Sequence, residues 1–350
     1  MKGIRQLAEH LQISTGTVSR ALNGKADVNA ETRRRVLEAA ETLGYVPNQA
    51  GRSLRQGRSR TIGLMLSHDS MVGGASDTFF PLVINGLQEA LSVHSLDLIL
   101  LLCQRGEAPD DFLRRMVAQR IVDAMVISST RLEDPRFPFL NKAGMPFVSL
   151  GRSHSATADN RWVDLDFEGI AERAVERLYQ HGHRKIAVAA PDTDVQLAEL
   201  FLDGYRRGLA HCGLDYDPDL VFRAEAHEQG GYAVGQRIIG LRNRPTAILL
   251  NAEMMSVGLY RSFGEAGLQP GRDLAIIAER ESPVGRFLLP RLTCFRLDPI
   301  AVGQMLGKML LSQLPAFADL YSDVPTTKIW PMELVEGESD PPPEKQSGLL

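Results

Sequence analysis

The stretch I-S-T-G-T-V-S-R-A-L-N, residues 13–23, decides how the first part of the chain folds. Ser14 is of a residue type that caps helix N-termini, and Val18, Ala21 and Leu22 recur at the spacing of one helical face. The remaining side chains are short, polar or cationic, which suits base edges and phosphates better than a partner protein's groove. The pattern predicts the DNA-reading helix of a helix-turn-helix, with these candidate contacts: Thr15, Gly16, Thr17, Ser19, Arg20 and Asn23.

The segments on either side complete a predicted three-helix head over residues 1–47. Apolar residues at helical spacing precede the stretch: Ile4, Leu7, Ala8 and Leu11. A third helix is predicted from Asn29 to a C-terminal cap at Gly44, with this apolar face: Val36, Leu37, Ala40 and Leu43. A three-helix protein-interaction module has the same periodicity, so the side chains exposed by the second helix are what favour DNA.

Residues 48–60 are predicted to be a hinge helix or linker, because the segment is too short and polar to form a stable helix alone. Leu54 is its one large apolar residue and lies among arginines. An ordinary linker can look the same, but an apolar wedge with basic flanks is also what insertion into a minor groove requires. The candidate contacts here are Asn48, Gly51, Arg52, Leu54 and Arg55.

Charge is distributed unevenly along the 350 residues. Residues 1–60 hold eleven basic and five acidic side chains, a net charge of +6, which leaves −10 for the remaining residues. A basic head on an acidic body fits a head that binds a polyanion. The three cysteines are far apart and the longest apolar runs are only strand-length, so we expect a cytoplasmic protein without a metal site or cofactor.

From residue 61 the sequence alternates strand-like and helix-like segments, among them predicted helices at 79–92, 136–143 and 196–211 and predicted strands at 185–190 and 246–250. This alternation predicts parallel sheets covered on both faces. We expect an α/β body of two doubly wound lobes over 61–335: one of about 61–158 plus 292–320, the other of about 159–290 plus 325–335. Residues 336–350 are rich in proline and charge and are expected to be a disordered tail. No dinucleotide fingerprint, P-loop or catalytic constellation is visible, so the sequence does not favour an enzyme.

The chain resembles the lactose-repressor/galactose-repressor (LacI/GalR) family of bacterial transcription regulators. The resemblance rests on residues 13–23, on E-T-R-R-R-V-L-E-A-A-E-T-L-G-Y-V-P-N (31–48), on R-S-L-R-Q-G-R (52–58) and on matches such as T-F-F (78–80) and R-P-T-A-I-L-L-N-A-E-M (244–254). It implies a periplasmic-binding-protein-like body and a homodimer on a pseudo-palindromic operator of double-stranded DNA. Thr15, Gly16 and Arg20 would read bases, and Leu54 would be the hinge wedge. The chain departs from the family at Gln12 and Gly51, where glycine and alanine are usual.

The resemblance also implies an effector site between the lobes. Phe79, Phe80 and Asn251 keep their family positions, whereas Phe201 replaces an arginine and Arg280 replaces an aspartate. A guanidinium favours carboxylate or phosphate, so the first hypothesis is a sugar-derived effector that is acidic. The alternative is a neutral sugar, with Arg280 paired internally to Glu279 or Glu281. The candidate effector residues are Phe79, Phe80, Phe201, Asn251, Arg280 and Glu281.

Three functions remain open from the sequence. The favoured one is a DNA-binding transcriptional repressor of carbohydrate-metabolism or transport genes, controlled by the effector. A sugar-binding transport protein of the periplasmic type shares the two-lobed body but lacks a use for the basic head. A cytoplasmic enzyme on a doubly wound sheet is the third. No membrane partner is expected.

Overall fold

A computed structural model describes residues 3–22, 25, 27–45, 59–67, 78–104 and 106–343. The chain forms two compact units, Met1–Ser59 and Arg60–Leu350. Of the predicted DNA contacts, Asn23, Asn48, Gly51, Arg52, Leu54 and Arg55 lie outside the described residues.

The first unit contains three short helices: α1 (Ile4–Leu11), α2 (Thr15–Leu22) and α3 (Ala30–Thr42). Their core is formed by Leu7, Val18 and Val36, which are fully buried. Leu37 was expected in this core but is 50% exposed. The buried face of α3 is formed by Val36 and Ala40, and Leu37 lies outside it. The turn between α1 and α2 places Gln12 in the left-handed region (φ 55°), where a glycine would avoid a strain of about 1 kcal/mol.

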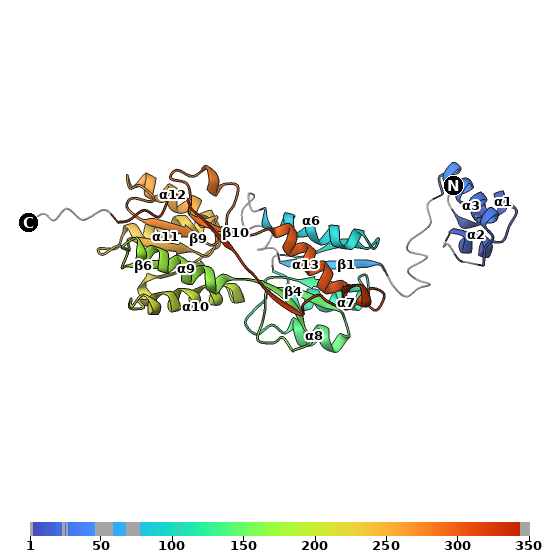
Figure 1. The fold of residues 1–350 in the computed structure, drawn as a ribbon, viewed down its shortest axis with the longest axis horizontal. Coiled ribbons are helices and arrows are strands. Elements are labelled where there is room, and N and C mark those ends of the chain that lie inside the picture. Colours follow the sequence, from blue (N-terminus) through green and yellow to red (C-terminus); the bar gives the residue numbers. More distant parts are fainter. Residues whose placement is uncertain are drawn as a thin grey trace, which may run out of the picture. The chain divides into compact units, whose positions relative to one another are not determined.

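The first lobe of the second unit is built on a six-stranded sheet in which all neighbouring strands are parallel. In spatial order the strands are β11 (Thr327–Trp330), β5 (Arg161–Leu165), β4 (Phe147–Leu150), β3 (Ala124–Ile127), β1 (Thr61–Ser67) and β2 (Asp97–Cys103). Helices α6 (Phe79–Ser92) and α13 (Pro299–Leu311) lie side by side on one face (Figure 1). The other face is covered by α7 (Pro109–Gln119) and α8 (Arg136–Ala143).

The second lobe repeats this plan on a four-stranded parallel sheet. Its strands are β7 (Val221–Ala224), β6 (Ile186–Pro191), β8 (Ala247–Leu250) and β9 (Ala275–Ala278). One face carries α9 (Phe167–Gln180) and α10 (Gln196–His211), and the other carries α11 (Glu228–Ile239) and α12 (Met255–Glu265) (Figure 1). An antiparallel pair, β10 (Cys294–Arg296) and β12 (Glu333–Val335), joins the sheet beside β9 through a bridge from Thr293 to Ile277. Short 3₁₀ turns follow at Pro218–Leu220, Gly285–Phe287 and Ala318–Tyr321.

The strands are apolar on both faces because both faces are covered by helices. In β6, Ile186 and Val188 pack against α9 and α10, whereas Ala187 and Ala189 face α11 and α12. This alternation confirms the predicted doubly wound α/β body of two lobes.

Three short strands belong to the other lobe than the sequence predicted. Arg161–Leu165 (β5) and Thr327–Trp330 (β11) were placed in the second lobe by sequence, but they pair with each other in the first sheet. Cys294–Arg296 (β10) was placed in the first lobe but pairs within the second. The chain therefore crosses between the lobes near residues 166, 297 and 331. Short strands at such crossings carry no local signal for the sheet they will join.

The expectation of a disordered tail over 336–350 is wrong for residues 336–343. Ser339 and Asp340 are buried, at 0% and 3% exposure. The Ser339 hydroxyl donates to the carbonyl of Ile276 and accepts from the amide of Thr293 (2.6 and 2.8 Å). These polar side chains are ordered because they satisfy buried backbone groups, a role that composition does not reveal. Residues 344–350 lie outside the described part of the chain.

Candidate functional site

A cavity of about 1080 Å³ lies between the two lobes of the second unit. Both sheets have the strand order 2-1-3-4 in their first four strands, so in each the order reverses between the first and third strand. Ligands of doubly wound sheets bind at the carboxyl ends of the strands at this reversal. The loops that line the cavity follow β3, β6, β8 and β9, in agreement with that rule.

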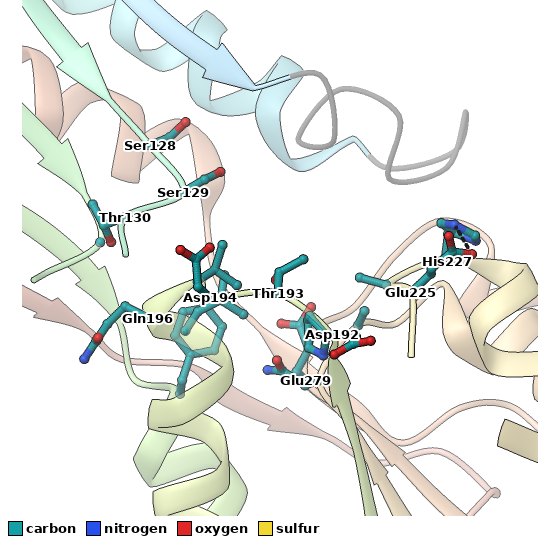
Figure 2. A pocket seen from close by; sticks show the side chains of 18 of the residues that line it. Ser128, Ser129, Thr130, Asp192, Thr193, Asp194, Gln196, Glu225, His227 and Glu279 are labelled. Carbon is teal, nitrogen blue, oxygen red and sulfur yellow. Dashed lines mark ion pairs between the residues drawn. The ribbon is translucent and has the colours of Figure 1, made fainter. Parts of the chain in front are cut away.

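The loops after β3 and β6 each bring polar groups to the wall of the cavity. Figure 2 shows Ser128, Ser129 and Thr130 on the side of the first lobe and Asp192, Asp194 and Gln196 on the side of the second. Backbone hydrogen bonds join the two loops directly. Gln196 donates its amide hydrogen to the Thr130 carbonyl at 2.8 Å, and Arg131 and Val195 form an antiparallel bridge. The lobes are therefore in contact at one edge of the cavity.

Asn251, which follows β8, offers a buried amide to the cavity. Its backbone amide donates to the Ala189 carbonyl (2.9 Å), which fixes the residue at the sheet edge. The residue is only 3% exposed, yet among the described residues neither its side-chain oxygen nor its nitrogen has a hydrogen-bond partner. The side-chain oxygen of Gln196 is likewise without a partner there. Buried amide atoms without partners are costly unless a ligand or water satisfies them.

Two aromatic rings from the start of α6 form the apolar part of the wall. Phe79 and Phe80 contact each other edge to face, with ring centroids 5.4 Å apart. Phe79 is buried and Phe80 is half-buried, and both line the cavity. The three predicted residues Phe79, Phe80 and Asn251 are therefore brought together from the two lobes.

Arg280 also lines the cavity, but its charge is neutralised within the protein. One terminal nitrogen donates to both carboxylate oxygens of Glu253 at 3.1 Å, and the other lies 3.9 Å from Glu279. The guanidinium covers the Phe79 ring, and the Arg280 side chain is 14% exposed. Of the two internal partners considered from sequence, Glu279 is present, whereas the principal partner is Glu253.

Two predicted effector residues do not line the cavity. Phe201 is 2% exposed and packs in the hydrophobic core, because its position on α10 faces the sheet. Glu281 pairs with Arg286 and Arg296 at 3.0 and 2.7 Å. The hydrogen bond from Arg296, together with Arg286, lowers the pKa of Glu281 to about 2. Glu281 is thus held by Arg286 and Arg296, whereas Arg280 is held by Glu253.

Carboxylates outnumber free cations in the cavity wall. Each lining arginine has a carboxylate partner: Arg131 with Asp110, Arg136 with Asp134, Arg223 with Glu199 and Arg280 with Glu253. Asp192 and Asp194 add two exposed acids to the same wall. The wall is thus neutral to negative, and sequence reasoning missed these acids even though they follow the predicted strand β6 directly.

Asp164, near the end of β5, is a buried acid of the wall with a raised pKa. Burial raises the pKa of its carboxyl to about 6, although the nearby Arg152 guanidinium opposes the shift. Arg152 lies 3.2 Å from Asp164 and also pairs with Glu168 of α9. Arg152 thereby ties the first lobe to the second.

In the first unit, α2 presents its predicted reading face to solvent. The Ser14 hydroxyl accepts from the Thr17 amide at 3.0 Å and so caps the helix. Thr15, Gly16 and Arg20 are exposed. Thr17 and Ser19, the other two predicted contacts on α2, are half-buried. A Cβ at Gly16 would meet nothing closer than 3.5 Å, so packing inside the head does not require glycine there.

Comparisons with known proteins match both units. The family model described as bacterial regulatory proteins, lacI family, matches residues 4–48, and a periplasmic binding protein-like domain matches residues 175–339. The HTH-type transcriptional regulator AglR of Rhizobium meliloti (strain 1021) is 35% identical over 99% of this chain and 96% of its own length. The regulator RafR of Escherichia coli is 30% identical over 89% of each chain.

Solved structures show the same fold. The structure titled transcriptional regulator CelR-cellobiose complex superimposes with a TM-score of 0.71 at 25% identity, covering 97% of this chain and 100% of its own. The lac repressor dimer bound to operator and the anti-inducer ONPF gives a TM-score of 0.81 at 22% identity, with 96% and 98% covered. None of the described helices combines the length and apolar character needed to cross a membrane.

Proposed function

The chain belongs to the lacI family of bacterial regulatory proteins, whose helix-turn-helix binds DNA, and we propose that it is a dimeric repressor controlled by a neutral carbohydrate. The effector would occupy the cavity between the lobes and bias their closure, which changes operator affinity as a coupling between two sites. A repressor acts where the chromosome is, so we place it in the cytoplasm.

The buried amide of Asn251 is the observation that carries the choice of ligand. An amide can donate to one hydroxyl and accept from another, which matches the paired hydroxyls of a sugar ring. The rings of Phe79 and Phe80 offer flat apolar surface beside it. Concave sites that combine apolar walls with a few fixed polar groups are typical for small molecules. The relative whose solved complex contains cellobiose supports the same ligand class.

The charges of the wall favour a neutral effector over an acidic one. An anion would have to displace Glu253 from Arg280 or lie near Asp192 and Asp194. Displacing Glu253 would leave its buried carboxylate without its main partner, which is costly. The hypothesis of an acidic effector therefore loses its main support, which was an unpaired Arg280.

The test combines a sugar panel with one variant. Full-length protein is titrated calorimetrically with neutral mono- and disaccharides and with a uronic acid. A neutral sugar should bind and change affinity for operator DNA, and Asn251→Ala should weaken sugar binding about tenfold, the loss of one or two hydrogen bonds. Binding of the uronic acid alone, or unchanged affinity in Asn251→Ala, would overturn the proposal.

Asn160→Ala is the matched control. Asn160 is equally buried, but it bonds to Asn141 and Thr157 and does not line the cavity. This variant should lower stability and leave sugar affinity unchanged, the reverse of the expectation for Asn251→Ala.

Exposed leucines of the first lobe mark the surface through which we expect two chains to associate. Leu82 on α6 and Leu100 and Leu102 on the edge strand β2 are 37%, 43% and 49% exposed. Helix α6 and strand β2 contact each other, so these side chains belong to one side of the lobe. Exposed large apolar side chains grouped on one side of a lobe favour an interface there. Leu100→Glu should convert a dimer to a monomer in light scattering, and an unchanged mass would exclude this surface.

A further inference from the structure

Outside the cavity, α9 and α10 bring together a group of metal-ligating side chains on the second lobe (Figure 1). Among the described residues, Glu172, Glu176 and His211 each offer a ligand atom within 4.8 Å of the others. None of them lines the inter-lobe cavity. We propose that these residues bind one divalent transition-metal ion, for which Zn²⁺ is the probe, and that the ion ties α9 to α10.

The helix packing positions the three side chains. Glu172 and Glu176 are four residues apart on α9, so both carboxylates lie on the same side of that helix. On α10, Gly204, Gly208 and His211 share one face at spacings of four and three residues.

The two glycines let the helix backbones touch. A Cβ at Gly204 would lie 2.1 Å from the carbonyl oxygen of Glu168, and one at Gly208 would lie 3.1 Å from that of Glu172. Because larger residues cannot fit there, α10 lies directly against α9. The next residue of the same stripe, His211, is thereby carried to the glutamate pair.

The three ligand atoms already lie close together. Nδ1 of His211 lies 3.0 Å from Oε1 of Glu176 and 4.0 Å from Oε1 of Glu172. Arg207 donates to the other oxygen of Glu172, Oε2, at 3.3 Å. Arg207 therefore holds that carboxylate from behind and leaves Oε1 directed at the imidazole, the role of an outer partner in metal sites.

Charge and exposure also fit a cation. Glu172 and Glu176 supply two negative charges, of which Arg207 offsets part at Glu172, so the pair attracts a cation. Imidazole nitrogen and carboxylate oxygen are ordinary zinc ligands, and water can supply the fourth position. The His211 side chain is 70% exposed and the two glutamates are about 30% exposed, so an ion reaches the group from solvent.

The test uses the full-length chain after treatment with a chelator. Zn²⁺ is titrated calorimetrically in a buffer that does not bind metals, and one ion per chain is expected. His211→Ala and Glu176→Gln should each lower the affinity by at least about tenfold, the lower range for loss of even an outer-shell partner. Zn²⁺ should also raise the unfolding temperature of the unaltered protein by more than that of the variants, because the ion binds the folded helix pair and binds the variants more weakly.

His154→Ala is the matched control, because His154 is similarly exposed (64%) but lies 3.6 Å from a single carboxylate, that of Glu133. It should retain the zinc affinity of the unaltered protein. Using two ligand variants guards against a folding defect in one of them. The proposal is overturned if no ion binds, or if Zn²⁺ binds equally well to His211→Ala and Glu176→Gln.

Discussion

The guanidinium carbon of Arg280 lies 4.5 Å from the centroid of the Phe79 ring, so a residue of the second lobe covers a residue of the first. The same guanidinium donates to Glu253, a side chain that is 3% exposed. Arg280 is therefore both an internal counter-ion and a contact between the lobes. A ligand that moves the two lobes apart or together should therefore change this contact.

Replacement of Arg280 should destabilise the fold. Arg280→Ala leaves the buried carboxylate of Glu253 without its main partner, and loss of one member of a buried pair typically costs about 3 kcal/mol or more. Urea unfolding should show this loss, and Arg280→Met combined with Glu253→Gln should recover most of it. Arg286→Ala, in which the removed side chain is 62% exposed, should cost less than about 1 kcal/mol. A similar loss of unfolding free energy for Arg280→Ala and Arg286→Ala would contradict the role of Arg280 as a buried counter-ion.

Asp164 should make stability fall as pH rises toward neutrality. Burial raises the pKa of its carboxyl from 3.8 to about 6, so between these pH values the folded state holds a proton that the unfolded chain has released. The stabilising contribution is complete below pH 3.8 and is lost as pH rises through about 6. Asp164→Asn should therefore stabilise the protein at pH 7 by roughly 2–3 kcal/mol and have little effect near pH 3.5.

Glu281→Gln should show the opposite pH dependence. Hydrogen bonds from Arg296 and Arg286 lower the pKa of Glu281 from 4.5 to about 2, so its stabilisation is present above 4.5 and is lost as pH falls toward 2. Because both arginines are more than half exposed, solvent screening limits the loss at pH 7 to about 1 kcal/mol. Denaturation curves recorded from pH 2 to 7 test both Asp164→Asn and Glu281→Gln. For either variant, a stability difference from the unaltered protein that does not change with pH would contradict the prediction.

The segment after β12 should stabilise the second lobe. Asp340 accepts a hydrogen bond from Arg177 at 2.6 Å and another from Thr293, and its side chain is 3% exposed. Asp340→Ala should cost about 3 kcal/mol in chemical denaturation. Glu336 pairs with the same arginine but is 70% exposed, so Glu336→Ala should cost less than about 1 kcal/mol. Equal effects of the two substitutions would mean that the segment contributes no buried contact.

Arg20 should discriminate between DNA sequences. Its guanidinium lies 3.7 Å from Asp27, and both side chains are more than half exposed, so the pair can open at little cost. Arg20→Ala should weaken binding to the cognate operator by about 1–3 kcal/mol and affect random DNA much less. Fluorescence anisotropy at one fixed salt concentration measures both. Asp27→Asn, which frees Arg20, should strengthen binding modestly, and equal losses on both DNAs for Arg20→Ala would rule out base reading.

Strongly periodic segments could be predicted from sequence, and their partners could not. The predicted helices at 79–92, 136–143 and 196–211 have the bounds of α6, α8 and α10. Apolar periodicity shows which face of an element is buried, so it predicts a helix well when that helix packs one face on a sheet. It does not report which sheet a short strand joins, as the exchange of β5, β10 and β11 shows.

The residues proposed for the cavity also differ in how far the sequence could predict them. Asn251 could be anticipated from its family position, and the structure places it directly after β8 at the edge of the sheet. Phe201 could not be excluded, because its place in a motif does not say which face of α10 it occupies. The pairing of Arg280 with Glu253 joins residues 27 positions apart, and no local pattern relates them.

Because the chain crosses between the lobes several times, it also determines when each lobe can finish folding during synthesis. β11 forms the edge of the first sheet and β12 closes the second, and both follow residue 326. Neither lobe has all its strands until the ribosome has passed these residues, whereas the three helices of residues 4–42 can pack as soon as they emerge. A chain truncated before Thr327 should thus yield a folded DNA-binding head attached to two lobes with unpaired strand edges, a species prone to aggregate.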